Sequence, residues 1–415
     1  MARSRPDAVR IVAETNRGRD PVLLRRKFEA MSRDAFAFLR ATARLGHSSV
    51  DLAALPRAPV AWICGDLHLQ NFGCFRGANR LVYFDLNDFD EAGLLPVPLD
   101  LVRLLASLLC AAPSLPLPAR EARRAALAAT QAYGEALAHG KAMWLERETA
   151  TGPLRELLRQ VDRRKRRSLL DTRTVRSGGR RRIRIDGDHH REVDEEDPVR
   201  EQIAFALGEI AAERGERDFF RPRDVARRVA GMGSLGVDRY VVLVRGRGDP
   251  DRNALIDFKL AVPSAALLAL PSYRQPAWAS EAERVTTVQE YCQAASPAYL
   301  GTSMLGGRAF IVRELQPVED RMSFEPLARH AQRLDETLAG MARLGAWAHL
   351  RAASRRGACG IDDLVAYAPS ILSRPLDWVE AAIEVNVRNR EAHASFRRAW
   401  RAKDRRLIAL CRAPA

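Results

Sequence analysis

A short segment near the start of the chain combines an aspartate and an asparagine in a spacing used for phosphoryl transfer. In "CGDLHLQNFG", Asp66 and Asn71 have four residues between them and directly follow the apolar segment 59–64. In phosphotransferase catalytic loops, an Asp at this position receives the proton of the acceptor hydroxyl and the Asn holds a metal ion. Because this spacing also arises by chance, its interpretation depends on what the rest of the chain adds.

A second acidic segment follows the next apolar stretch. In "YFDLNDFDEA", residues 83–92, the chain carries Asp85, Asp88 and Asp90. Carboxylates at the end of a buried strand are costly unless a cation offsets their charge, and Mg²⁺ prefers a few carboxylate or amide oxygens together with phosphate oxygens. The interval from Asn71 to Asp85 leaves room for a hairpin. We therefore predict a Mg²⁺ site with Asn71, Asp85 and Asp88 as ligands and Asp90 in support, and either Asp85 or Asp88 can be the main ligand.

A glycine-rich segment far along the chain is typical of a phosphate-binding turn. "GMGSLGVDRYVVLV", residues 231–244, places Gly231, Gly233, Ser234 and Gly236 before a run of apolar and β-branched residues. Glycines let backbone amides approach phosphate oxygens closely. A helix after the glycines would indicate a dinucleotide-binding fold, whereas this run favours a strand. The segment thus predicts a kinase-like Gly-rich loop.

One lysine stands out because the chain almost always uses arginine. Of the 67 basic residues only five are lysines, and Lys259 lies in the apolar segment "ALIDFKLAV". A compact ammonium group on a buried strand is a candidate phosphate ligand. The alternative is a lysine on an edge strand whose ammonium group reaches solvent.

His68 and Arg103 are two further candidates for the site. His68 could be a metal or acid–base group, but at this position of such a loop a structural hydrogen bond is the commoner role. Arg103 follows on a predicted helix, where we expect it to form an ion pair with a carboxylate of the site rather than to contact substrate.

The elements that must position these residues fall into four stretches. Residues 1–150 are expected to be α-rich around short strands at 59–64 and 80–85, and residues 151–199 form a charged connector with a hairpin. Residues 200–324 are predicted to form a β-rich nucleotide-binding lobe, and residues 325–415 return to helix, including 338–356. The expected fold is α+β.

Composition limits the classes of protein that the chain can represent. With 415 residues and 47% hydrophobic content it can bury a large core, and its length favours two or three lobes. No segment approaches the roughly 18 uninterrupted apolar residues of a membrane span, and the N-terminal segment has no apolar stretch typical of a signal peptide. We expect a soluble cytoplasmic protein with no membrane partner. The scattered cysteines predict neither a zinc site nor disulfides.

The formal charge of +15 raises the possibility of a nucleic-acid partner. The surplus of Arg, Ala and Leu pervades the whole chain, which indicates codon bias rather than a binding face. The exception is the segment 159–185, where basic residues cluster. Two interpretations of this segment remain open. It is either a solvated helix end followed by a hairpin, or a polyanion-binding surface.

The order of the segments is reversed relative to a protein kinase. The Gly-rich loop and strand lysine precede the catalytic loop in kinases, whereas here they follow it by more than 150 residues. Such a circular permutation is physically tolerable because chain termini and connections lie at the surface. The order predicts a two-lobed, kinase-like fold in which the helical catalytic lobe comes first and is completed by the C-terminal helices.

Five segments together resemble a known bacterial family: "CGDLHLQNFG", "VYFDLNDFDEA", "LDLVRLLASL", "VAGMGSLGVDRYVVLVRG" and "ERVTTVQEYCQAASPAYLG". Over about residues 20–360 the chain is similar to the family called domain of unknown function 2252, which is grouped with protein-kinase-like folds that include aminoglycoside phosphotransferases. The resemblance implies that Asp66 is the base, that Asn71 and Asp85 are metal ligands, and that Asp100 is a structural acid that braces the site. It also implies that Lys259 meets the α- and β-phosphates of ATP.

The resemblance leaves some positions open. Glu281, Glu283 and Glu290 are candidates for the glutamate that pairs with Lys259, and Glu283 is favoured. Relatives follow the strand lysine with Glu-Ala and carry a histidine near Ala353, whereas this chain has "KLA" and, by this comparison, no such histidine.

Three functions remain as hypotheses. The first is an ATP- and Mg²⁺-dependent phosphotransferase acting on a hydroxyl of a small molecule or protein. The second is a nucleotide-binding pseudokinase with a signalling or scaffold role. The third is a polyanion-binding protein that uses residues 159–185. The sequence names neither the acceptor nor the oligomeric state.

Overall fold

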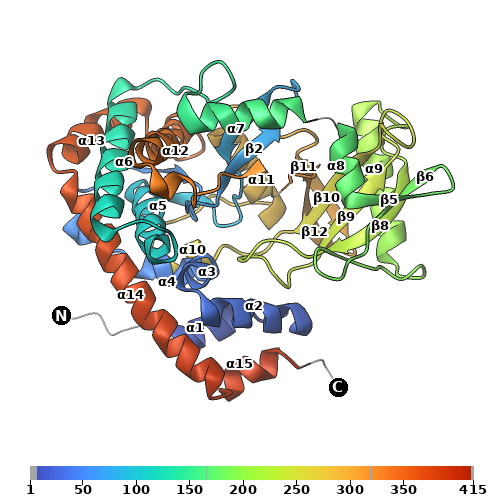
Figure 1. Ribbon diagram of the computed structural model, residues 1–415, viewed down its shortest axis with the longest axis horizontal. Coiled ribbons are helices and arrows are strands. Elements are labelled where there is room, and N and C mark those ends of the chain that lie inside the picture. Colours follow the sequence, from blue (N-terminus) through green and yellow to red (C-terminus); the bar gives the residue numbers. More distant parts are fainter. Residues whose placement is uncertain (1–6, 165, 318–319, 413–415) are drawn as a thin grey trace.

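The computed structural model describes residues 7–164, 166–317 and 320–412. A body of helices lies on one side of the molecule and a six-stranded antiparallel sheet on the other (Figure 1). The predicted α+β class is therefore confirmed. Within the described part of the chain, no helix has the length and apolar content that a membrane span requires.

The elements follow one another along the described chain with these bounds. The helices are α1 (Ala8–Thr15), α2 (Pro21–Arg33), α3 (Ala35–Arg40), α4 (Ala43–Ser48), α5 (Pro98–Ala111), α6 (Ala119–His139), α7 (Gly152–Arg163), α8 (Arg166–Arg173), α9 (Val199–Arg214), α10 (Ala265–Ala269), α11 (Glu281–Cys292), α12 (Ala331–Ala352), α13 (Ile361–Ser373), α14 (Leu376–Arg401) and α15 (Arg405–Leu410). The strands are β1 (Val60–Ile63), β2 (Phe72–Arg76), β3 (Val82–Leu86), β4 (Gly93–Pro96), β5 (Thr174–Ser177), β6 (Arg180–Ile183), β7 (His190–Arg191), β8 (Pro222–Arg228), β9 (Arg239–Val244), β10 (Ala254–Leu260), β11 (Gly301–Leu305) and β12 (Arg308–Glu314).

Two short antiparallel ribbons lie against the helical body. β1 pairs with β4, and β2 pairs with β3. Their apolar residues, among them Trp62, Phe72 and Phe84, are fully buried in one core with α5, α6 and α12. Because β1 leads into β2 and β3 leads into β4, the two intervening loops, 64–71 and 87–92, both begin at buried strands. The predicted hairpin that returns toward Asn71 is the β2–β3 ribbon.

The large sheet has the strand order β11-β12-β10-β9-β8-β7. Ile256 and Phe258 of β10 pack with α9 in one apolar core. Since side chains alternate along a strand, Leu255, Asp257 and Lys259 face the other side. β10 lies between β9 and β12, so the alternative that placed Lys259 on an edge strand is wrong.

Residues 20–50, in the first stretch predicted to be α-rich, form the three helices α2, α3 and α4. The side chain of Asp34 accepts hydrogen bonds from the backbone amides of Phe36 and Ala37, which ends α2 and starts α3. Apolar residues of this N-terminal segment pack against α14 and α15. The first and last described helices therefore lie side by side at the bottom of Figure 1.

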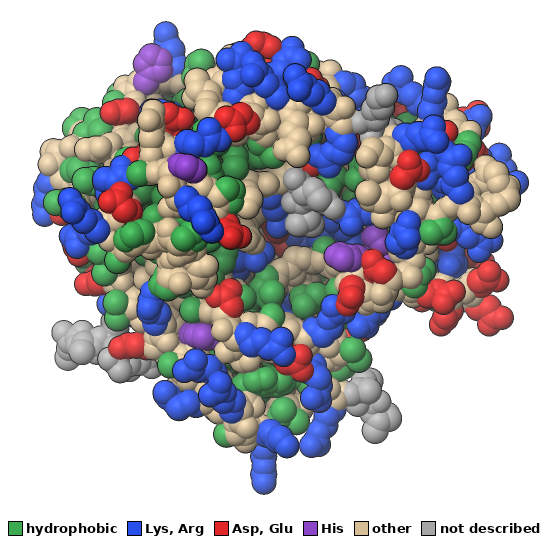
Figure 2. Space-filling view, in the orientation of Figure 1, with side chains coloured by type: hydrophobic (Ala, Val, Ile, Leu, Met, Phe, Trp, Pro, Cys, Tyr) green, Lys and Arg blue, Asp and Glu red, His purple; other side chains and the backbone are tan. Residues whose placement is uncertain are grey.

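The basic segment 159–185 contains the end of α7, then α8 and the β5–β6 hairpin, as one alternative predicted. Several of its arginines are neutralised within the chain. Arg181 is only 3% exposed and pairs with Asp171 and Asp251, and Arg176 pairs with Asp251. Figure 2 shows basic side chains spread over the visible face with acidic ones among them, rather than gathered in one patch.

Candidate functional site

The loop that carries Asp66 is held by a buried carboxylate at the start of α5. Asp100 is fully buried and accepts hydrogen bonds from the backbone amides of Cys64 and Gly65, both at 2.9 Å. His349 of α12 lies 3.2 Å from the same carboxylate through Nε2. Asp100 thereby fixes the backbone just before Asp66, the position at which the resemblance implied a bracing acid.

Asp66 projects from this loop and is oriented by an arginine. Nε of Arg103 donates to Oδ1 of Asp66 at 2.8 Å, and Nη2 of Arg103 donates to the carbonyl oxygen of Leu39 at 2.6 Å. Arg103 is 3% exposed, whereas the Asp66 side chain retains 16% exposure. Burial raises the pKa of Asp66 and the Arg103 guanidinium opposes that rise. Arg103 thus holds Oδ1 of the Asp66 carboxylate in place.

Asn71 joins the two acidic loops. Its Nδ2 donates to the carbonyl oxygens of Asp66 and Asp88 at 2.9 and 3.0 Å. Its Oδ1 accepts from the backbone amide of Asp88 at 2.7 Å. With 2% exposure, Asn71 holds the loops 64–71 and 87–92 in a fixed relation, so the polar atoms of the predicted metal ligand already bond within the protein.

Lys259 meets two carboxylates of the second acidic loop. Its Nζ lies 2.5 Å from Oδ2 of Asp90 and 3.2 Å from Oδ1 of Asp88. Burial alone would raise the pKa of Asp88, but Lys259 and Arg313 outweigh it and lower that pKa. Burial and the charge of Asp88 raise the pKa of Asp90. Since the Asp88 side chain is 48% exposed, it remains accessible from the cavity described next.

Three carboxylates of the two acidic loops line one cavity of about 330 Å³ between the helical body and the large sheet. Asp66, Asp88 and Asp90 contribute to its wall, as do residues from α1, the α3–α4 junction and the segment after β10. Gly233, Ser234 and Gly236 line it from the turn that joins β8 to β9. Of the remaining predicted phosphate-binding residues, Gly231 and Lys259 are not wall residues, although Lys259 reaches the acidic loop.

The Gly-rich turn is fastened by two basic residues of the N-terminal segment. Nζ of Lys27 donates to the carbonyl oxygen of Gly233 at 2.7 Å, and Arg19 donates to the carbonyl oxygens of Gly233 and Leu235 at 2.6 and 3.1 Å. Lys27 is 1% exposed, and burial lowers its pKa well below the usual value. Neither residue was predicted, because the contact spans roughly two hundred residues of sequence.

Asp85 points away from the cavity. Its carboxylate accepts from the backbone amides of Leu86 and Ala294 at 2.9 and 3.1 Å and lies 3.5 Å from Nη2 of Arg351. On β3 it is 1% exposed. The predicted ligand role of Asp85 therefore does not fit this geometry, and of the two alternatives Asp88 is the one at the cavity.

The predicted partner of Lys259 was wrong. Glu283 lies in the first turn of α11, where its Oε2 accepts from the backbone amide of Ala279 at 2.6 Å. Glu283 therefore bonds to the backbone at the start of its own helix. The negative charges that pair with Lys259 come from Asp88 and Asp90. The pairing could not be found from the sequence because the acids lie in the other half of the fold.

His68 has a structural contact of the kind expected. Its Nδ1 accepts from the backbone amide of Gln70 at 3.1 Å, and burial, together with nearby arginines, lowers its pKa well below the usual value.

The prediction that the helix around 338–356 has no histidine for the site was wrong. His349 of α12 contacts Asp100, and its Nδ1 lies 2.7 Å from the hydroxyl of Tyr133. The sequence does show this histidine, four residues before Ala353.

The sequence analysis also did not predict a buried charge cluster on three neighbouring strands of the large sheet. Asp257 is 1% exposed and pairs with Arg239 at 2.5 Å and Arg228 at 3.0 Å. These cations hold the pKa of Asp257 far below its usual range despite burial. Asp257 lies two positions from Lys259 on the same face of β10, so the cluster borders the site.

The described side chains at the cavity do not by themselves make up a metal site. Among the described residues, no group of three or more His, Cys, Asp or Glu side chains forms a complete metal site. Mg²⁺ commonly takes one or two carboxylates and completes its shell with water and substrate phosphates. The accessible carboxylate of Asp88, with Asp90 beside it, meets that lesser requirement.

Comparison with known proteins identifies a family. The model of an uncharacterised protein family conserved in bacteria, domain of unknown function 2252, matches residues 19–399. No curated protein and no solved structure matches the chain. Since the match covers most of its length, the chain belongs to this family.

Proposed function

We propose that this family member is an ATP- and Mg²⁺-dependent phosphotransferase with a circularly permuted, protein-kinase-like architecture. The observation that carries the proposal is that Asp66, Asp88 and the turn Gly233–Gly236 line one cavity although they come from segments far apart in the chain. Phosphoryl transfer needs positioning and charge stabilisation more than covalent chemistry. A cavity that combines a carboxylate base, a metal-binding carboxylate and a glycine turn supplies those parts.

The connectivity supports the permuted order. The Gly-rich turn joins β8 to β9, and β9 pairs with β10, which carries Lys259. After β12 the chain returns to the helical body through α12, where His349 contacts Asp100. In this proposal the sheet is the nucleotide lobe, and the helical body with its C-terminal helices is the catalytic lobe.

Asp66 would act on the acceptor hydroxyl. The hydroxyl proton moves to the carboxylate oxygen that Arg103 does not hold, the acceptor oxygen bonds to the γ-phosphorus, and the bond to the ADP oxygen breaks. Because burial raises the pKa of Asp66, the carboxylate is a better proton acceptor than an exposed aspartate would be.

Backbone amides of the turn Gly233–Gly236 and the ammonium of Lys259 would hold the phosphates. Asp88, supported by Asp90, would hold Mg²⁺, which when bound neutralises phosphate charge. Lys259 also pairs with both carboxylates, which stabilises the acidic loop.

A second candidate, nucleotide binding without turnover, is favoured by Asn71. Both ends of its amide bond to protein groups, so the residue that would be a second metal ligand is occupied structurally. This candidate predicts the same nucleotide site and differs only in chemistry.

The test combines titration of a fluorescent ATP analogue in Mg²⁺ with turnover of radiolabelled ATP. Asp66→Ala should keep nucleotide affinity within about threefold and lower turnover by roughly 10²–10⁴. Lys259→Ala should weaken both. Asp194→Ala and Lys403→Ala, at exposed positions, are the matched controls.

Folded wild-type protein that does not bind ATP would refute the proposal. Equal loss of affinity in Asp66→Ala and Lys259→Ala would contradict the division of roles. Binding without any turnover would establish the second candidate.

A further inference from the structure

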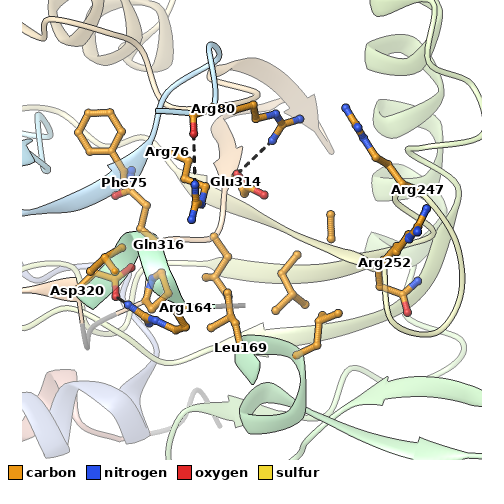
Figure 3. Close-up of a pocket in the computed structure, with 17 residues that line it drawn as sticks. Phe75, Arg76, Arg80, Arg164, Leu169, Arg247, Arg252, Glu314, Gln316 and Asp320 are labelled. Carbon is orange, nitrogen blue, oxygen red and sulfur yellow. Dashed lines mark hydrogen bonds and ion pairs between the residues drawn. The ribbon is translucent and has the colours of Figure 1, made fainter. Parts of the chain in front are cut away.

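A second cavity, of about 430 Å³, lies at the far end of the same sheet face (Figure 3). Its walls come from the β2–β3 ribbon, the α7–α8 region, the turn between β9 and β10, and the end of β12. Leu255 lines this cavity, and Lys259 stands four positions further along β10. At the rise of a strand this separates the two sites by about 13 Å.

The floor of the cavity is apolar. Leu170, Leu255 and Leu315 are at most 6% exposed and belong to one small core. Phe75, Val161 and Leu169 extend the apolar lining. Pockets for small molecules commonly have a volume in this range, a mainly apolar wall and a few polar groups.

The rim of the cavity is strongly basic. Its charged lining consists of five arginines and two acids, namely Arg76, Arg80, Arg164, Arg247, Arg252, Glu314 and Asp320. The two acids have basic neighbours: Arg164 pairs with Asp320, and Arg80 lies 3.9 Å from Glu314. Among the described residues, the side chains of Arg247 and Arg252 form no ion pair or hydrogen bond. Figure 3 shows both on one side of the cavity, opposite Arg164.

We propose that this cavity binds a small organic anion with an apolar body of the size of one or two aromatic rings. The anionic group lies at Arg247 and Arg252, and the body lies on the leucine floor. The site is separate from the cavity at Asp66 and does not depend on the phosphotransferase proposal.

The probe is 8-anilinonaphthalene-1-sulfonate, which combines a sulfonate with aromatic rings. Fluorescence titration of the full chain should show one saturable site. Arg247→Ser/Arg252→Ser should weaken binding about tenfold, the effect of two partly exposed charge contacts. Arg217→Ser/Arg405→Ser removes the same charge at exposed positions elsewhere and should change affinity less than twofold.

Two further measurements keep the test decisive. Leu169→Trp fills the cavity from its partly buried wall and should abolish saturable binding, while circular dichroism checks that the variant folds. N-phenyl-1-naphthylamine lacks the sulfonate and should not distinguish the Arg247/Arg252 variant from wild type. Absence of saturable sulfonate binding, or equal weakening by the two double-arginine variants, would overturn the proposal, as would undiminished binding in folded Leu169→Trp.

Discussion

Replacing Gly65 by alanine tests how tightly the catalytic loop packs on the acidic loop. Gly65 has a φ of +80°, and a Cβ at this position would lie 2.1 Å from the carbonyl oxygen and 2.6 Å from the carbonyl carbon of Glu91. The left-handed conformation costs a non-glycine residue about 1–2 kcal/mol. The clash involves backbone atoms that cannot rotate away, and overpacking of this kind adds about 1–3 kcal/mol.

Gly65→Ala should therefore lower the free energy of unfolding by about 2–5 kcal/mol, measured by urea denaturation. Gly208→Ala is the matched control, because Gly208 lies in α9 with open space around its Cβ position. Alanine in a helix is favoured over glycine by about 0.5–1 kcal/mol, so the control should be neutral or stabilising. If the two variants unfold within 0.5 kcal/mol of each other, the described contact between the loops is refuted.

Three further substitutions test other parts of the account. Asp257→Asn leaves Arg239 with an uncompensated buried charge and should cost about 3–5 kcal/mol of stability by urea denaturation; a loss below 1 kcal/mol would contradict a buried pair. Asp85→Asn should destabilise by about 1–3 kcal/mol with unchanged Mg²⁺·ATP affinity, because Asp85 bonds to backbone amides and Arg351 rather than facing the cavity; a large loss of affinity in the folded variant would return the ligand role to it. Burial lowers the pKa of His47 to about 4, so its stabilising contribution is complete above the unfolded pKa of about 6.5 and is lost as pH falls toward 4. Between pH 7 and pH 5 the free energy of unfolding should fall by about 2 kcal/mol less in His47→Gln than in wild type. An equal decrease in both proteins would contradict a neutral buried imidazole.

The sequence predicted those parts of the fold that depend on local pattern. Apolar runs located β1 and β3, and the interval between the acidic segments indicated the β2–β3 hairpin. The region 200–324, predicted to be β-rich, contains five strands of the large sheet, whereas the strand β7 precedes it. An isolated lysine among apolar residues indicated a buried strand position, and Lys259 is 4% exposed on β10.

Contacts between distant segments could not be predicted in this way. Whether Asp85 or Asp88 faces the cavity depends on where β3 ends, and one residue of register reverses the face that a side chain takes. The partners of Lys259 and the fastening of the Gly233 turn by Lys27 join segments more than 150 residues apart. Such pairs are set by packing, and no spacing along the chain encodes them.

In the proposed function, nucleotide phosphates bind between the Gly-rich turn and the acidic loops. A crystal structure of the full chain with Mg²⁺ and a non-hydrolysable ATP analogue measures this directly. We expect the γ-phosphate to lie in the cavity lined by Gly233, Asp66 and Asp88, with Lys259 turned from the carboxylates toward the phosphates. A nucleotide bound elsewhere, or an empty cavity at saturating analogue, would contradict it.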